Sequence, residues 1–135
     1  MREILFRGKT SGNEWVYGNL SVIGDVCFIS ADMGFNKTVI PKTIGQYTGL
    51  TDNYGKKIFE GDIIKQEFSL NRAEREVLSS IEYGTGYAYC NVYGVCQRFK
   101  DGSGVSLLSV FNESGMVLCE VIGNIHDNPE LLKGE

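Results

Sequence analysis

Residues 14–29 read EWVYGNLSVIGDVCFI, and this stretch shows the pattern that decides the fold. Aromatic and β-branched residues fill its first half, which is typical of a strand. The pair Gly24-Asp25 then separates two apolar runs, and this pair suits a tight turn with positive φ. The stretch therefore predicts a strand that reverses at Gly24-Asp25 into a second strand. The apolar run at residues 4–7 predicts a strand that precedes both.

Short apolar runs and turn residues alternate along the rest of the chain. Further strands are expected at residues 37–40, 77–83, 105–111 and 116–122, and 17 glycines against two prolines favour many tight turns. Alternation from Gly86 to Phe99 predicts one long strand, and the glycine pair at residues 84–86 predicts a hairpin turn. Between residues 52 and 64, Gly55 suits a left-handed turn position, and Gly61-Asp62 predicts a bend between two strands.

Two segments carry helix signals. Residues 70–78 contain good helix formers, so a loop or one helical turn is expected there before the next strand. Asn128-Pro129-Glu130 combines a capping residue, a proline at the first helical position and an acid in the first turn, which predicts a short terminal helix. The fold class expected is therefore all-β: a small barrel or sandwich of short strands with a short C-terminal helix. A single domain over residues 1–135 is expected.

Composition narrows the functional classes. The formal net charge is −4, with Lys and Arg residues scattered, so nucleic acid is a less favoured partner than protein. No apolar run is long enough for a signal peptide or a membrane span, and a cytoplasmic location in a bacterial host is expected. Cys27, Cys90, Cys96 and Cys119 lack the paired spacing of zinc ligands, so free thiols are expected.

Three blocks of the sequence resemble the YopX family: residues 2–8 with 15–18, residues 38–50 with 55–64, and residues 121–132. They lie at both ends and in the centre of the chain, and the central block is the most specific. Residues 66–119 match no part of the family pattern. The positions that carry the resemblance are Trp15, Pro41, Gly45, Gln46, Tyr47, Thr48, Gly49, Glu60, Gly61, Asp62, Gly123, Asn124, Asn128 and Pro129.

The resemblance implies a small β-rich protein encoded in a phage, a prophage or a related mobile element. It implies no activity, substrate or cofactor, and it supplies no catalytic residue.

Candidate catalytic and metal-binding residues are few. His126 is the only histidine, and Asp127 beside it would point away from it on a strand. Glu60 and Asp62 lie two residues apart, as an acid–base pair could require, but turns select these residue types as well. The favoured interpretation is that Asp62 caps local backbone amides beside a bend at Gly61. The sequence therefore assigns no catalytic residue, no cofactor and no metal ligand.

One candidate interaction face emerges. Tyr83, Tyr87, Tyr89 and Tyr93 share one parity along the strand pattern, as do aromatic residues that line an interface or stack on single-stranded nucleic acid. The first hypothesis is a non-catalytic phage accessory protein that contacts itself, as a homo-oligomer, and an unidentified phage or host protein. The alternative is a small β-barrel that binds single-stranded nucleic acid. The third hypothesis is an enzyme with carboxylate chemistry near Asp62.

Overall fold

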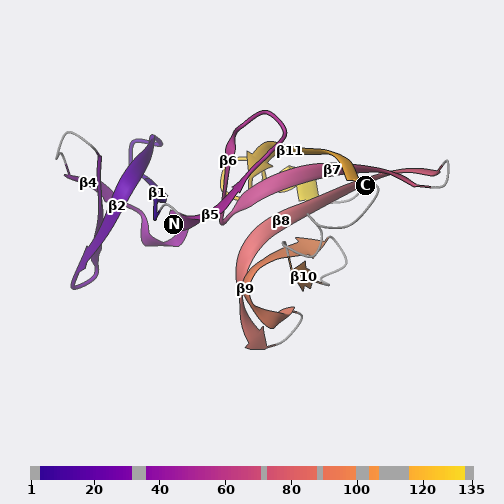
Figure 1. Ribbon diagram of the computed structural model, residues 1–135. Helices are drawn as coiled ribbons and strands as arrows, with labels where there is room; N and C mark the ends of the chain where they lie inside the picture. Colours follow the sequence, from indigo (N-terminus) through magenta and orange to yellow (C-terminus); the bar gives the residue numbers. More distant parts are fainter. Residues whose placement is uncertain are drawn as a thin grey trace. The chain divides into compact units, whose positions relative to one another are not determined.

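The computed structural model describes residues 4–31, 36–70, 73–87, 90–99, 104–106 and 116–132 (Figure 1). The contacts within the chain group it into two units, residues 1–50 and 51–135. The expectation of one domain over residues 1–135 stays a prediction. The described residues form two antiparallel sheets, so the all-β prediction is confirmed.

The first unit consists of short strands and one 3-10 turn. In chain order these are β1 (Phe6–Lys9), β2 (Trp15–Ile23), β3 (Val26–Ser30), β4 (Asn36–Val39), the 3-10 turn η1 (Pro41–Thr43) and β5 (Gly45–Thr51). The last residue of β5, Thr51, begins the second unit. The sheet has the order β4-β3-β2-β1-β5-β6, so β2 lies between β1 and β3.

The core of the first unit lies on one face of its sheet. Cys27, Ile29 and Val39 are buried together, and four partly buried side chains pack against them: Phe6, Val16, Leu20 and Ile44. Successive residues of a strand point to opposite faces, so the even-numbered positions Val16 and Leu20 of β2 face this core. The odd-numbered positions of β2 face the other way.

The second unit contains longer strands. They are β6 (Lys57–Phe59), β7 (Asp62–Leu70), β8 (Ala73–Tyr87), β9 (Cys90–Phe99), β10 (Gly104–Ser106) and β11 (Met116–Asn124), followed by the 3-10 turn η2 (Pro129–Leu132). The second sheet has the order β10-β9-β8-β7-β11, and Figure 1 shows β8 as a long curved strand. The strand predicted at residues 116–122 is confirmed as β11.

Burial in the second unit centres on the start of β7. Ile63 and Ile64 are adjacent in sequence and both are fully buried, so both faces of β7 are covered at this point. Ile58, Ile81 and Cys119 are likewise buried. Apolar burial of this kind contributes about 1.5–3 kcal/mol for each large side chain.

The prediction of a loop or helical turn at residues 70–78 is wrong, because β8 already begins at Ala73. An antiparallel ladder joins β7 to β8 without interruption from Ile63↔Ser80 to Leu70↔Ala73. This ladder gives each residue a cross-strand partner, and that tertiary pairing overrides the weak helix propensity of the segment.

The single long strand predicted from Gly86 to Phe99 is two strands. β8 runs through the glycine pair at residues 84–86, which is therefore not the turn, and ends at Tyr87. β9 begins at Cys90, and the two pair from Ser79↔Phe99 to Tyr87↔Cys90. The two sets of alternating side chains continue with period two through the reversal between β8 and β9. The sequence pattern therefore does not show where one strand ends and the next begins.

The short C-terminal helix is only a 3-10 turn. It begins at Pro129, as predicted, but it ends at Leu132, and Leu131 N donates to Asn128 O at 3.1 Å. Four residues make a 3-10 turn more readily than an α-helix, because the first α-helical turn costs much backbone entropy. Neither 3-10 turn of the described residues has the length or apolar character of a membrane-crossing helix.

The bend predicted at Gly61 is confirmed. β6 ends at Phe59, β7 begins at Asp62, and Gly61 between them has φ of +95°. The Gly61 backbone is held at both ends, because its N donates to Ile81 O at 2.8 Å and its O accepts from Ile125 N at 2.8 Å. A side chain at this φ is strained, since only glycine adopts it readily.

We predict that Gly61→Val lowers the free energy of unfolding by about 1–3 kcal/mol, the scale of local backbone strain. Gly12→Val is the matched control, because a Cβ at Gly12 meets only Thr10 Oγ1 at 3.7 Å and Gly12 lies in an exposed turn. Denaturant unfolding of both variants measures the difference. Equal stability of the two variants would contradict the account of the bend.

Candidate functional site

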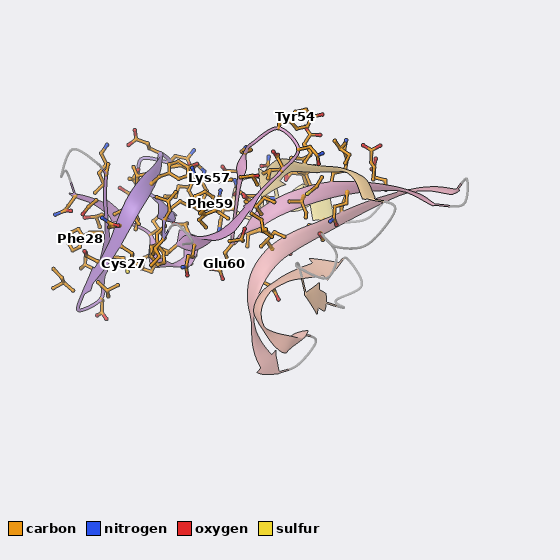
Figure 2. All side chains as sticks on the ribbon, in the orientation of Figure 1. Cys27, Phe28, Tyr54, Lys57, Phe59 and Glu60 are labelled. Carbon is orange, nitrogen blue, oxygen red and sulfur yellow. The ribbon has the colours of Figure 1, made fainter. Side chains whose placement is uncertain are left out.

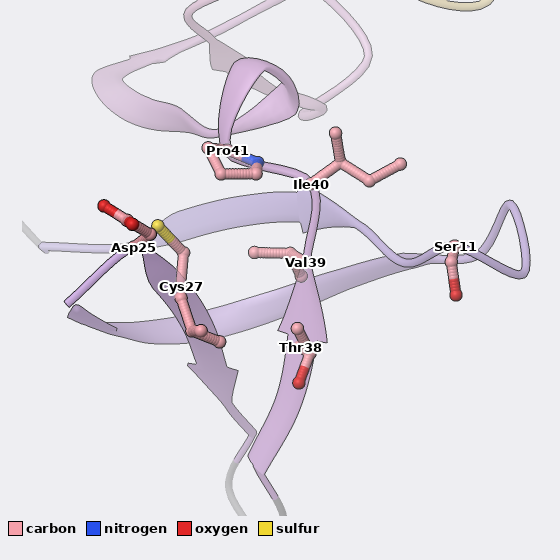
Figure 3. Close-up of a pocket in the computed structure, with 8 residues that line it drawn as sticks. Ser11, Asp25, Cys27, Thr38, Val39, Ile40 and Pro41 are labelled. Atoms are coloured by element: carbon pink, nitrogen blue, oxygen red, sulfur yellow. The ribbon is translucent and has the colours of Figure 1, made fainter. Parts of the chain in front are cut away.

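A pocket of about 290 Å³ lies in the first unit (Figure 3). Figure 3 shows residues of β3, of β4 and of the segment after β4 around it. Its apolar wall comes from Val26, Cys27, Val39, Ile40 and Pro41, and its polar rim from Ser11, Asp25 and Thr38. Cys27 pairs with Val39 across the β3–β4 ladder, which places two of the apolar walls side by side.

The tip of the β2–β3 hairpin borders this pocket and is unusually apolar. Val22, Ile23 and Val26 expose 59%, 71% and 43% of their surface. The turn between the strands consists of Gly24, with φ of +62°, and Asp25, as the sequence predicts. Ile23 pairs with Val26 and Val22 with Cys27, so branched side chains project on both faces of the hairpin end. Exposed apolar residues that gather like this mark interaction sites.

An acidic residue lines the pocket, and a basic residue follows one of the pocket residues in the sequence. Asp25 lines it at the hairpin tip, and the exposed Lys42 follows Pro41 in η1. η1 is fixed on β1, because Lys9 N donates to Thr43 Oγ1 at 2.9 Å and Ile40 N donates to Lys9 O at 2.8 Å. The pocket residues Ile40 and Pro41 therefore belong to a segment that is hydrogen-bonded to β1.

The predicted tyrosine face lies in the second unit. Tyr83 and Tyr87 are on β8 and Tyr93 is on β9, while Tyr89 lies outside the described residues. The β8–β9 ladder shifts register between Thr85 and Tyr87. The side chains of all four tyrosines lie outside the described part of the chain, so this face stays a prediction.

Of the predicted pair Glu60 and Asp62, Asp62 makes a structural contact. Asp62 is 2% exposed, and its Oδ2 accepts a hydrogen bond from Phe59 N at 2.7 Å. This bond closes the bend around Gly61, which is the backbone-capping role that the sequence favours. Among the described residues, no group of three or more His, Cys, Asp or Glu side chains is arranged to hold a metal ion.

A second buried carboxylate, Asp52, joins the turn after β5 to β11. Its Oδ1 accepts from Tyr54 N and Lys56 N, both at 2.9 Å, and its Oδ2 accepts from Val121 N at 3.0 Å. Asn53 adds a reciprocal pair, because its N donates to Cys119 O at 3.0 Å and its Oδ1 accepts from Cys119 N at 2.7 Å. Tyr54 lies at the tip of this turn (Figure 2). A carboxylate with these donors stabilises the fold and has little basicity left for catalysis.

The same contacts set two pKa values. Burial raises the pKa of Asp52, but hydrogen bonds from Val121, Lys56 and Tyr54 and the charge of Lys56 outweigh it, so the pKa lies below its ordinary value. Burial, followed by the charge of Asp52, raises the pKa of Cys119 to about 11. The Cys119 thiol is therefore neutral at neutral pH and a poor nucleophile. Cys27 and Cys119 are free and buried, and the side chains of Cys90 and Cys96 lie outside the described residues.

The motif positions near the C-terminus form a hydrogen-bonded turn. Asn124 Oδ1 accepts from His126 N at 3.0 Å and from Asp127 N at 2.9 Å. Asn128 Oδ1 accepts from Asn124 N at 3.2 Å, and a Cβ on Gly123 would lie 2.6 Å from that oxygen. His126 thus lies in a turn rather than on a strand, and the described contacts of this motif are structural.

Motif positions of the first unit also make structural contacts. The Arg7 guanidinium carbon lies 4.7 Å from the centre of the Trp15 ring. Tyr47 N donates to Leu5 O at 2.8 Å, and Thr48 Oγ1 accepts from Leu50 N at 3.1 Å. Pro41 occupies the first position of η1, where its fixed φ and missing N–H cost nothing.

The sequence pattern does not indicate that the hairpin tip is exposed. Its residues are ordinary strand formers, and period-two alternation assigns them to two faces without saying which face is covered. The weak signal is that Val22-Ile23 and Val26 keep apolar residues on both sides of a two-residue turn, where solvent-exposed hairpin ends are usually polar.

Comparison with known proteins gives a family and a fold relative. The family model described as YopX protein matches residues 6–133. A crystal structure of protein EF1440 from Enterococcus faecalis is similar, with 26% sequence identity and a TM-score of 0.56, over 98% of this chain and 99% of that chain. No curated protein matches the chain.

We predict that Asp52→Asn lowers the free energy of unfolding at pH 7 by about 1–3 kcal/mol, because one buried N–H loses its acceptor. The pKa of Asp52 is lower in the folded state, so its stabilisation is present above the unfolded-state pKa of about 3.9 and is lost as pH falls through the folded-state pKa. The difference in free energy of unfolding between the wild type and the variant should therefore become smaller in strong acid. Denaturant unfolding across the acid range measures it, and a gap independent of pH would contradict the account.

Proposed function

The chain belongs to the YopX family, and from that premise we propose that it is a non-catalytic accessory protein encoded by a phage or prophage. It acts in the cytoplasm of a bacterial host through contacts with an unidentified phage or host protein, and it associates with itself. The observation that carries the proposal is the apolar tip of the β2–β3 hairpin beside a pocket. Similarity over nearly the whole chain to a protein of Enterococcus faecalis supports the bacterial setting.

Self-association is the contact that this surface suits best. A two-fold dimer uses the same patch on both copies, so a group that projects from the patch needs a matching recess within the same patch. Ile23 projects at the hairpin tip with 71% of its surface exposed. The pocket beside it, bordered by Val26 and Val39, provides the recess. Insertion of each tip into the pocket of the other copy would cover both.

Charges support the same arrangement. In a two-fold contact, Asp25 of one copy can approach Lys42 of the other, and the reciprocal pair forms at the same time. Residues 1–50 contain five Lys and Arg against four Asp and Glu, which gives a net charge of +1. Two such surfaces repel each other weakly, whereas residues 51–135, with eight Lys and Arg against thirteen Asp and Glu, carry −5.

We predict that Ile23→Lys raises the dimer dissociation constant at least tenfold. Burying one isoleucine contributes about 1.5–3 kcal/mol, and a two-fold contact loses two of them. Ile125→Lys is the matched control, because Ile125 is 40% exposed in the second unit. Sedimentation velocity over a concentration series measures the dissociation constant. A wild-type protein that stays monomeric at high concentration would contradict the proposal.

The charge pair gives a second, independent test. Asp25→Lys and Lys42→Asp should each weaken self-association, and the double variant should restore it, because it exchanges the two charges of each pair. Both residues are exposed, so neither change should impair folding. Single variants that associate as tightly as wild type would remove Asp25 and Lys42 from the contact.

A further inference from the structure

The outer face of β2 carries aromatic residues. Trp15 and Tyr17 occupy odd positions of β2, opposite in direction to Val16, which packs on the core. Tyr17 is 46% exposed, and Trp15 is half-buried. In the neighbouring strand, Phe28 pairs with Ser21, so Phe28 lies on the same face and is half-buried. This aromatic face comprises Trp15, Tyr17 and Phe28.

Strand β1 places two cations beside the aromatic face. Lys9 pairs directly with Trp15 and Arg7 with Tyr17 in the β1–β2 ladder. The Lys9 Nζ lies 5.6 Å from the centre of the Trp15 ring, and the Arg7 guanidinium carbon lies 4.7 Å from it. Arg7 is only 5% exposed, so it helps to hold the indole in place, whereas the half-buried Lys9 keeps part of its surface at the solvent.

The charge distribution opposes an anionic ligand less in the first unit than in the second. The net charge of −4 arises from residues 51–135, while residues 1–50 carry +1. The acidic balance of the whole chain therefore says little about this face. Exposed polar residues continue the face along β2, namely Asn19 and Ser21, and such side chains can contact phosphate and sugar.

We propose that the aromatic face of β2 binds single-stranded nucleic acid, with a base stacked on the exposed Tyr17 and a phosphate bound by Lys9, beside the Trp15 indole that Arg7 and Lys9 contact. Stacking on a sheet face needs unpaired bases, and the aromatic residues lie on neighbouring strands of one sheet, so single strands fit better than a duplex. The site is distinct from the hairpin tip, because Trp15 and Ile23 lie eight residues apart on β2, roughly 26 Å along a strand. Self-association through the hairpin tip and nucleic-acid binding by the aromatic face can therefore be tested independently.

Trp15 gives the site a direct readout. It is the only tryptophan of the chain, so intrinsic tryptophan fluorescence reports on this face alone. Titration of the full chain with a single-stranded oligothymidylate of roughly 12 nucleotides should perturb this fluorescence saturably. Tyr17→Ser should weaken the affinity about tenfold, while Tyr17→Phe, which keeps the ring, should bind as wild type does. Circular dichroism of both variants checks that the fold is retained.

Salt dependence identifies the phosphate contact. Lys9→Gln should reduce the slope of log affinity against log salt concentration by about 0.7, the value for one phosphate contact on a single strand. Lys37→Gln removes the same charge from the same unit and is the control. Lys37 pairs with Glu14 at 3.0 Å, and exposed pairs of this kind contribute little to stability. The control should keep the wild-type slope.

Several results would overturn the proposal. They are the absence of a saturable fluorescence change, equal affinity for duplex and single strand, an unchanged affinity of Tyr17→Ser, and an equal response to an acidic peptide of the same charge. The last result would indicate a protein ligand for this face instead.

Discussion

β2 pairs with β1 along one edge and with β3 along the other. These two ladders together determine which face of the sheet each side chain of β2 lies on. Arg7↔Tyr17 on one side and Leu20↔Ile29 on the other fix which residues face the core. The core of the first unit, the aromatic face and the hairpin tip all follow from this register. A shift of one residue would exchange the two faces, burying Tyr17 and exposing Val16.

In the second unit, two buried carboxylates fix the path of the backbone, as the two ladders of β2 do in the first unit. Asp52 and Asp62 are both buried carboxylates at a change of chain direction. Asp52 accepts hydrogen bonds from three backbone N–H groups, and Asp62 accepts one from Phe59 N. A buried carboxylate is tolerable when such donors satisfy it, and it then fixes the local backbone. The described contacts of Asp52 and Asp62 are thus structural.

The sequence predicts turns better than it predicts where strands end. Gly24, Gly55 and Gly61 have the positive φ that their sequence context indicates, because glycine is selected locally for that conformation. The reversal between β8 and β9 is missed, because alternation continues across it. The strand predicted at residues 77–83 is part of β8, but the start of β8 at residues 73–76 is missed for another reason, since its pairing with β7 is a tertiary effect. The exposed hairpin tip is missed because local pattern does not report burial.

The register of β2 can be measured directly by nuclear Overhauser effects in the isotope-labelled protein. Cross-strand contacts between backbone protons should join Arg7 to Tyr17 and Ser21 to Phe28, as the two ladders require. Contacts that join Arg7 to Val16 or to Gly18 instead would show a register shifted by one residue. That result would place the aromatic side chains in the core, and it would contradict the account of this sheet and of both surfaces derived from it.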